Sequence, residues 1–492
     1  MIKVIFNILI CGLLLFLQAQ TTVTNKVSDF INKESLMQKV EILTSQEFAG
    51  RLPGHIGYDK ASEYARKHFQ ELGLKPAFGN DYYQKLLVEY NEIKPPASFC
   101  LIKDDKVFIE YKIGTDYAFR GFTGSGDLVA PVVFCGYGIS TEGHDDYENI
   151  DVTGKIVMVF KQNPAWKIDG VDFGTGNPRE KANTAYNKGA VGLIMVSRPL
   201  DNNPQPVIGS VMDGSGLHNE NFPQLQISLD AANDFLSGMD LYIEDLQSKI
   251  DGNKRPFSFE LPVSALIKVK AEYHSKKETQ NIAAILAGSD EELSNEYIVV
   301  GAHLDHVGSQ ADEVYYPGAN DNASGSAAVI HIAEAFVKSG YQPKRSIIFI
   351  LFAAEEQGLK GAEYFTENSP VELENIVAMI NLDCIGSGDS IQIGNGKSAP
   401  DLWNIFRKID SENNNLMMNR TWAGGGADAT PFHNKKIPTA YVVSYYSYEH
   451  LHLPTDLPET LNQSLFESIV KLTAESLYQI SFGKYKREQL TN

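Results

Sequence analysis

The chain has 492 residues, which is long enough for several domains or for one large domain with an insertion. Its 43% hydrophobic and 21% charged residues are typical of globular proteins and exclude a disordered chain or a fibre. The formal net charge of −19 would repel a polyanionic backbone, so nucleic acid is not expected as a partner.

The N-terminus is typical of a removable export signal. Lys3 gives a positive start, and a short apolar run over residues 8–17 precedes polar and small residues. The run is too short to span a bilayer, and it fits the core of a secretory signal better than a strand or helix of a folded domain. We expect a signal peptide over residues 1–19 and an exported protein, periplasmic or extracellular. No later stretch of the sequence predicts a membrane span.

Cysteine usage argues against two kinds of stabilising site. Cys11 lies inside the expected signal, so the mature chain keeps Cys100, Cys135 and Cys384. An odd number of cysteines does not make a complete disulfide framework. Because the sequence has no CxxC pair, a zinc site built from thiolates is not expected either.

The remaining chain has three regions that differ in the pattern of their apolar residues. Residues 20–117 begin with a helical pattern that stops near Gly73. Residues 118–265 carry short apolar runs between Gly, Pro, Asn and Asp clusters, which predicts a β-rich segment with some helix. Residues 266–492 alternate between near-continuous apolar runs and helical patterns, and Gly340 follows one of the expected helices. This alternation predicts an α/β fold in which helices sandwich a mixed, mainly parallel sheet.

Polar residues follow the expected strands of the last region. In open α/β sheets, sites form where the strands end, so we expect these side chains to converge. Histidine and carboxylate ligands suit zinc, with manganese or cobalt possible, and they exceed one tetrahedral shell. The surplus fits a carboxylate that bridges two metal ions. The residues concerned are His303, Asp305, Asp321, Glu355, Glu356, Asp383, His450 and His452.

Taken singly, each motif also has an ordinary structural explanation. In extended chain, Asp305 can accept a hydrogen bond from the ring nitrogen of His303 that does not bind metal, or it can be a surface residue. Adjacent Glu355 and Glu356 diverge, so that one binds metal and the other reaches water, or both simply begin a helix. Asp321 can equally cap the helix that follows it.

Asp383 and its neighbour Cys384 follow an apolar run. Asp383 can ligate a metal ion or close a turn. Strand alternation places Cys384 on the opposite face, so we do not expect it to be a ligand.

Together and in this order, the motifs resemble those of the dizinc metallopeptidases that include bacterial leucyl aminopeptidases, aminopeptidase S and glutamate carboxypeptidase. The site motifs with this resemblance are GAHLDHVG, GANDNASG, LFAAEEQGLKGAEYF, NLDCIG and HLPTDLPETL. The opening LTSQEFAGRLPGHIGYDKASEYARKHFQELGLKP is similar to that of the exported bacterial members. Residues 118–265 look like an inserted protease-associated domain, which in this family carries no catalytic residue and serves access, partner binding or spacing.

The resemblance implies a role for each motif residue. One zinc ion would be bound by His303 and Asp383, the other by Glu356 and His452, with Asp321 bridging the two. Asp305 would support His303, and Glu355 would be the general base. His452 is preferred to His450 because it fits the His-x-Pro-x-Asp spacing to Asp456.

The sequence departs from the family pattern at two places. Leu451 and Leu453 flank His452 where the family often has Tyr and then Thr or Ser, so Tyr445, Tyr446 and Tyr448 are candidates for a tyrosine contact. In GGGADATPF, Asp428 matches a family Asp but is followed by Ala429 where His is common. We interpret Asp428 as a turn residue after three glycines.

The resemblance implies an exported zinc aminopeptidase that acts on peptides with a free N-terminus. The alternatives are a glutaminyl cyclase of the same fold, a carboxypeptidase or dipeptidase of the same family, and a binding protein with an inactive peptidase domain. A complete ligand set argues against the first and the last. The sequence leaves residue preference, natural substrate and oligomeric state open.

Overall fold

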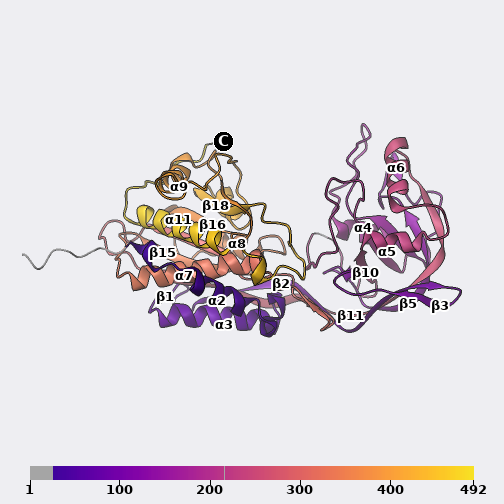
Figure 1. Cartoon of the computed structure of the whole chain (residues 1–492), viewed down its shortest axis with the longest axis horizontal. Coiled ribbons are helices and arrows are strands. Elements are labelled where there is room, and N and C mark those ends of the chain that lie inside the picture. Colours follow the sequence, from indigo (N-terminus) through magenta and orange to yellow (C-terminus); the bar gives the residue numbers. More distant parts are fainter. Residues whose placement is uncertain (1–25, 215, 492) are drawn as a thin grey trace, which may run out of the picture.

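The computed structural model describes residues 26–214 and 216–491, which form two lobes (Figure 1). The predicted signal peptide lies outside these residues. The first lobe contains both ends of the described chain, and the second lobe contains its middle. Two long strands, β2 (Tyr83–Lys103) and β11 (Ser258–Leu286), run antiparallel to each other from one lobe into the other.

The first lobe is built on a sheet whose four central strands are parallel. The order is β18 (Thr439–Tyr445), β16 (Ile376–Leu382), β12 (Tyr297–His303) and β15 (Ser346–Phe352). Antiparallel neighbours close both sides, namely β17 (Ser390–Gly394) and the last residues of β11. These strands coincide with the near-continuous apolar runs of the sequence, because both of their faces are covered.

Alternate residues of these strands face two helical layers. Val300 and Phe349 belong to one core, Val299 and Ile348 to the other, as the period of two requires. The first core is covered by α2 (Lys33–Leu43), α3 (Ile56–Glu71), α7 (Gly325–Lys338), α9 (Pro400–Glu412) and α11 (Gln463–Ser481). The second is covered by α8 (Lys360–Glu367) and α10 (Ala429–Asn434). The predicted α/β sandwich is confirmed.

Two predicted helix ends also lie where the glycines indicated. Helix α7 ends at Lys338 and Gly340 has φ 68°, while α3 ends at Glu71 and Gly73 has φ 71°. Such left-handed positions favour glycine, which has no Cβ to clash with the carbonyl that follows. The two glycines therefore indicate helix ends because the backbone there needs a left-handed conformation.

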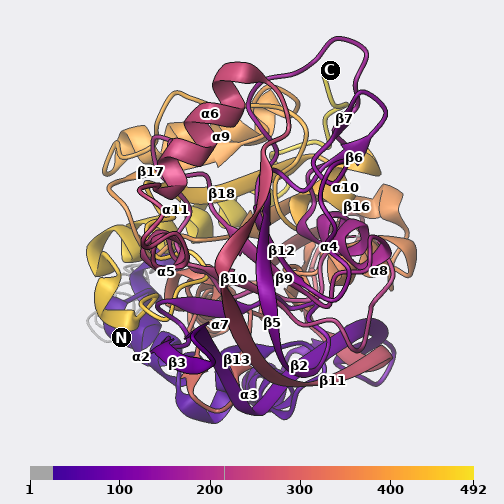
Figure 2. The same cartoon turned by 90° about the vertical axis from the view of Figure 1, so that its right-hand side faces the viewer.

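The second lobe has its own parallel strands, which makes it more α/β in character than its sequence texture predicted. β5 (Gly126–Cys135), β8 (Ile156–Phe160), β9 (Gly192–Val196) and β10 (Gln224–Ile227) are parallel, with β4 (Tyr117–Phe119) antiparallel at the edge. Its helices are α4 (Pro178–Asn187), α5 (Leu229–Phe235) and α6 (Ile243–Asn253), which Figure 2 shows in front of the first lobe.

The core of the second lobe includes residues that precede the expected boundary at 118. Phe99, Leu101 and Tyr111 pack with Phe134 and Phe235. They do so because β2 continues into this lobe and pairs there with β3 (Lys106–Glu110). The limits 118–265 of the insertion stay a prediction.

The other elements are short. The strands are β1 (Lys75–Pro76), β6 (Ser140–Thr141), β7 (His144–Asp145), β13 (Ser309–Gln310) and β14 (Val314–Tyr315). The single turns are η1 (Val27–Phe30), η2 (Gln46–Arg51), η3 (Ala319–Ser324), η4 (Leu373–Asn375) and η5 (Pro458–Thr460). Of these, η2, η3 and β13 with β14 lie beside the site described below.

Cys100, Cys135 and Cys384 are free and buried. Within residues 26–214 and 216–491, each helix is too short or too polar to cross a bilayer.

Glu334 on α7 forms a buried ion pair that links α2 to the core of the first lobe. Its carboxylate lies 3.1 Å from Lys39 Nζ of α2 and 2.8 Å from His331 Nδ1, and all three residues are buried. Burial alone would raise the pKa of Glu334, but its bonds with His331 and Lys39 lower it to about 2. A carboxyl with a lowered pKa stabilises the fold above its unfolded value of about 4.3, and this contribution is lost as the pH falls toward 2.

We expect Glu334→Gln to lower the free energy of unfolding by about 3 kcal/mol at neutral pH, because it leaves Lys39 buried without a charged partner. The deficit should shrink as the pH falls below about 4.3, where the parent protein loses the same interaction. Urea unfolding at neutral and acid pH measures both effects. Glu363→Gln is the matched control, since Glu363 pairs with Lys360 at 3.4 Å on an exposed surface. A deficit that does not change with pH would contradict the assignment.

Candidate metal centre

Two groups of side chains suited to bind metal meet where the central strands end. In each group the potential ligand atoms lie within 4.8 Å of one another. The first group is His303, Asp321 and Asp383, and the second is His306, Asp321, Glu356 and His452. The structure therefore brings together the five residues that the sequence predicted as ligands, and it adds His306.

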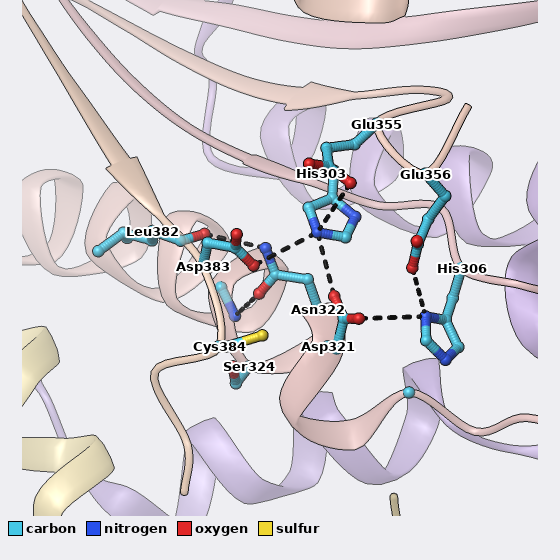
Figure 3. Close-up of polar contacts among 12 residues, drawn as sticks. His303, His306, Asp321, Asn322, Ser324, Glu355, Glu356, Leu382, Asp383 and Cys384 are labelled. Carbon is cyan, nitrogen blue, oxygen red and sulfur yellow. Dashed lines mark hydrogen bonds and ion pairs between the residues drawn. The ribbon is translucent and has the colours of Figure 1, made fainter. Parts of the chain in front are cut away.

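Asp321 is shared by the two groups. Its Oδ1 lies 3.2 Å from His303 Nε2, and its Oδ2 lies 3.2 Å from His452 Nε2. Figure 3 shows this carboxylate between His303 and His306. One oxygen faces each group, which is the arrangement of a bridging carboxylate.

Each ligand position follows from the topology of the sheet. His303 is the last residue of β12, and Asp383 follows β16 directly. Glu356 lies in the turn between β15 and α8, and His452 lies in the loop after β18. Asp321 lies in η3, at the start of the helix that returns from β12. Parallel strands bring all these ends to one edge of the sheet.

The backbone turns sharply at this edge. Ala354, Cys384, Ala427 and His452 have φ between 41° and 56° although none is a glycine. Residues with a Cβ populate this left-handed region rarely, and such residues gather at functional sites. Three of the four stand next to a site side chain, and the fourth carries one itself.

The predicted bond between His303 and the Asp305 carboxylate is corrected by the structure. His303 Nδ1 lies 3.1 Å from the backbone carbonyl of Asp305, whereas the nearest carboxylate oxygen is 3.8 Å away. The spacing rule fails because β12 ends at His303, so the next residues are no longer extended. A carbonyl only accepts, so Nδ1 must carry the proton and Nε2 is left free for metal.

The Asp305 carboxylate instead fixes the Glu-Glu turn. The backbone N–H of Glu355 donates to Asp305 Oδ1 at 3.1 Å, and that of Glu356 donates to Oδ2 at 3.3 Å. Asp305 is fully buried, and burial raises its pKa to about 7. Its role is to position Glu355 and Glu356 through their backbone.

Asp456 positions Asp321 in a similar manner, through hydrogen bonds from the backbone. Its carboxylate accepts the N–H of Asn320 at 2.9 Å and that of Asp321 at 3.1 Å. The helix-capping role considered for Asp321 belongs to Asn322, whose Oδ1 accepts the N–H of Gly325 at 2.9 Å. The Asp321 side chain is thereby left for the two groups.

Glu355 and Glu356 are adjacent but have opposite titration behaviour. Burial alone would raise the pKa of Glu356, but the charge of His452 and the bonds from His306 and His452 lower it to about 2. The pKa of Glu355 is raised well above its usual range by burial and by the carboxylates around it, Asp428 first. Glu355 lies 4.0 Å from His303 Nε2 and belongs to neither ligand group. The two adjacent carboxyls therefore differ in their surroundings, since Glu356 faces two histidines and Glu355 faces other carboxylates.

His306 was missed in the sequence. It is fully buried, its Nδ1 lies 2.9 Å from Glu356 Oε1, and its ring is 5.4 Å from that of His452. It stands in the same GAHLDHVG motif as His303 and Asp305. His306 is thus a third polar residue at the end of that strand, and this position is the sequence feature that indicates it. His450 lies apart from both groups and contacts Thr455 Oγ1 at 3.0 Å.

Tyr441 and Asp428 complete the surroundings of the first group. Tyr441 Oη donates to Asp383 Oδ2 at 3.1 Å and lies 3.4 Å from Tyr448 Oη. Of the three tyrosines proposed from the sequence, Tyr448 is thus linked to the site through Tyr441. Asp428 does lie in the turn before α10, but its side chain is fully buried and faces the site, where burial raises its pKa well above the usual range.

Arg51 connects the GRLPG segment to both ligand-bearing loops. Its guanidinium donates to the backbone carbonyls of Leu304 at 2.8 Å, Pro317 at 2.7 Å and Gly318 at 2.9 Å, and to that of Leu43 at 2.7 Å. The side chain is fully buried, and burial lowers its pKa to about 10. Arg51 therefore stays charged at neutral pH and holds the chain on either side of the site.

A cavity of about 730 Å³ opens beside Tyr441. Its lining has five aromatic residues together with polar and charged ones such as Arg420 and Glu449, and one lining residue comes from the second lobe. The lining includes Trp422, Tyr441, Tyr445, Tyr446, Tyr448 and, from the second lobe, Asn203. Because Tyr441 contacts Asp383, the cavity adjoins the first ligand group.

Parts of the chain are similar in sequence to known proteins. Residues 281–477 match the profile of peptidase family M28, and residues 124–235 match that of the PA domain. An aminopeptidase of Pseudomonas aeruginosa is 27% identical over 368 residues, covering 73% of this chain and 59% of that protein. The chain thus spans less than two thirds of that relative's length.

Solved structures share the fold across both lobes. A peptidase M28 precursor from Shewanella amazonensis has a TM-score of 0.65 at 21% identity, over 94% of this chain and 98% of that chain. A zinc aminopeptidase from Bacillus subtilis has a TM-score of 0.62 at 17% identity, over 94% of this chain and 98% of that chain.

Proposed function

We propose that this chain, whose residues 281–477 match peptidase family M28 and whose residues 124–235 match the PA domain, is a zinc-dependent aminopeptidase that removes N-terminal residues from peptides. The observation that carries this proposal is Asp321, which turns one carboxylate oxygen toward each of two ligand groups. The names of its relatives support the same activity.

The donor set fits two zinc ions. Nitrogen and oxygen ligands without thiolate suit zinc in a catalytic site. His303, Asp321 and Asp383 would hold one ion, and Asp321, Glu356 and His452 the other. Among the buried atoms without a hydrogen-bond partner is Asp383 Oδ1, which lies 3.4 Å from His303 Nε2. When bound, the zinc ions lower the pKa of a water molecule and polarise the scissile carbonyl.

Glu355 supplies the proton transfer. Its side chain is 17% exposed, so it borders the space beside the ligand groups. With a raised pKa, its carboxylate can accept the proton of the attacking water and pass it to the leaving amine nitrogen. Asp305 keeps Glu355 in place through the backbone N–H that it accepts.

The cavity beside Tyr441 would take the side chain of the N-terminal residue. Its aromatic lining favours a large apolar side chain. We also propose that the protein is exported, which rests on the signal-like residues 1–19 alone.

The proposal is tested with aminoacyl anilides and with peptides whose amino end is free or blocked. We expect cleavage only when the amino end is free, together with two zinc ions per chain. Cleavage of blocked peptides would favour a carboxypeptidase or dipeptidase. Conversion of N-terminal glutamine to pyroglutamate with one zinc ion per chain would favour a glutaminyl cyclase.

Zinc affinity should fall as the pH is lowered. Burial alone would lower the pKa of His303 and His452, but the surrounding carboxylates raise it well above the usual value. Because both histidines must lose a proton to bind zinc, protons compete with the metal already above the ordinary histidine pKa of about 6.5, and binding should weaken progressively as the pH falls. Chelation should abolish activity, and added zinc should restore it. Activity that survives complete removal of metal would exclude the proposed chemistry.

A further inference from the structure

We propose that the second lobe positions one of the two ligand groups, the one containing Glu356 and His452. This inference rests on the proposed function, because it concerns how zinc is held. It assigns the inserted domain a direct part in the site, through contacts with the backbone beside two ligands.

The first contact is made by Gly209. Its backbone N–H donates to the carbonyl of His452 at 2.9 Å, so a segment of the second lobe holds the residue that carries the ligand. The approach is very close. A Cβ at position 209 would lie 2.7 Å from Val307 Cγ2 and 2.9 Å from the Tyr316 ring. Val307 follows His306, another member of the same group, and Val211 packs in one buried cluster with Val307 and Tyr316.

The segment is also fixed on the side of the second lobe. Ser210 Oγ accepts the N–H of Gly121 at 2.8 Å, and the carbonyl of Pro206 accepts from Gln226 at 2.8 Å. Gln226 lies on β10, within the sheet of the second lobe. The position of His452 is therefore tied to the sheet of the inserted domain.

The second contact reaches the turn that carries Glu356. Gln357 Nε2 donates to the carbonyl of Glu89 at 2.9 Å. The Glu89 carboxylate is held by both terminal nitrogens of Arg179 from α4 of the second lobe, at 2.9 and 3.0 Å, and by Tyr273 Oη at 2.8 Å. Charged pairs in this two-pronged geometry are directional, so Arg179 fixes Glu89 and, through it, the turn.

The other ligand group is held by the first lobe. His303 and Asp383 stand at the ends of β12 and β16, and their neighbours Leu304 and Tyr441 are fixed by Arg51 and by β18. Loosening the second lobe should therefore weaken one zinc site and spare the other. A general loss of stability would weaken both.

The test compares zinc binding in four variants of the full-length protein, with zinc content and chelator competition as readouts. Gly209→Ala places a Cβ too close to Val307 and Tyr316 and so disturbs the contact with His452. Arg179→Ala removes the two hydrogen bonds to the Glu89 carboxylate. Gly192→Ala is the control for the first, because its Cβ would meet only ordinary contacts of 3.4 Å or more. Arg198→Ala is the control for the second, because Arg198 contacts Asp201 and Asn163 within the second lobe.

We expect Gly209→Ala and Arg179→Ala to lose one zinc ion at about 10-fold lower chelator concentration than the parent, with the second ion unaffected. The controls should match the parent. If both test variants bind both ions like the parent, or lose both together, the inference is wrong. Should Gly209→Ala fail to fold, Arg179→Ala decides alone. A parent protein that binds no zinc would instead refute the proposed function.

Discussion

Replacing Glu355 by glutamine is expected to lower kcat for aminoacyl anilides by about 10²- to 10⁴-fold, the usual contribution of a general base. Glutamine keeps the size of the side chain but cannot accept the proton of the attacking water. Glu355 belongs to neither ligand group, so zinc content should stay at the parent value. The backbone N–H that anchors the turn to Asp305 is also unchanged.

Steady-state kinetics with metal analysis separates this result from a structural effect. KM should change little, because the substitution removes an interaction made during proton transfer. Glu363→Gln, the same change at an exposed position of α8, serves as the control and should leave kcat unaltered. Unchanged turnover in Glu355→Gln would remove Glu355 from the mechanism, and loss of zinc would make it a ligand.

Replacing Arg51 by methionine is expected to destabilise the protein by more than about 4 kcal/mol, because the loss of a buried hydrogen-bond network is one of the few changes with so large an effect. Four backbone carbonyls would lose a buried hydrogen-bond donor. The positive charge of Arg51 also offsets the negative charges of Asp321, Asp456 and Asp305. In the variant these carboxylates would repel one another more strongly.

Urea unfolding and zinc titration measure the two consequences. We expect Arg51→Met to unfold at lower urea and to bind zinc more weakly, since both loops that carry ligands lose their anchor. Arg66→Met on the surface of α3 is the matched control, because the hydrogen bonds of Arg66 are made to the nearby side chains of Glu63 and Gln70. Equal stability of the two variants would contradict the role assigned to Arg51.

The sequence predicted those parts of the site that depend on strand ends. His303, Glu356 and Asp383 follow long apolar runs, and such runs identify buried parallel strands whose ends must meet. The alternation of side-chain direction, by contrast, predicts which way a residue points only while the chain remains in the strand. This explains why the partner of His303 Nδ1 is the backbone carbonyl of Asp305 and not its carboxylate.

Arg51 and Tyr441 show what a sequence pattern does not reveal. Arg51 acts on the carbonyl of Leu304, which is 253 positions away, and backbone carbonyls carry no residue-specific signal. Tyr441 lies in an apolar run typical of a buried strand, and the direction of its hydroxyl depends on the register of β18 beside β16. The contacts of such side chains depend on tertiary position, which a local sequence pattern does not contain.

The paired strands β2 and β11 explain how this fold accommodates so large an insertion. Ile102 is paired with Ser264 and Lys94 with Lys270, so the chain leaves the first lobe and returns to it at neighbouring positions. The insertion thus stands on a hairpin stem. The closure of that stem is set by strand pairing, and the entropy of a longer loop grows only slowly with its length. Domains of different size could occupy the tip of the stem without disturbing the sheet at its base.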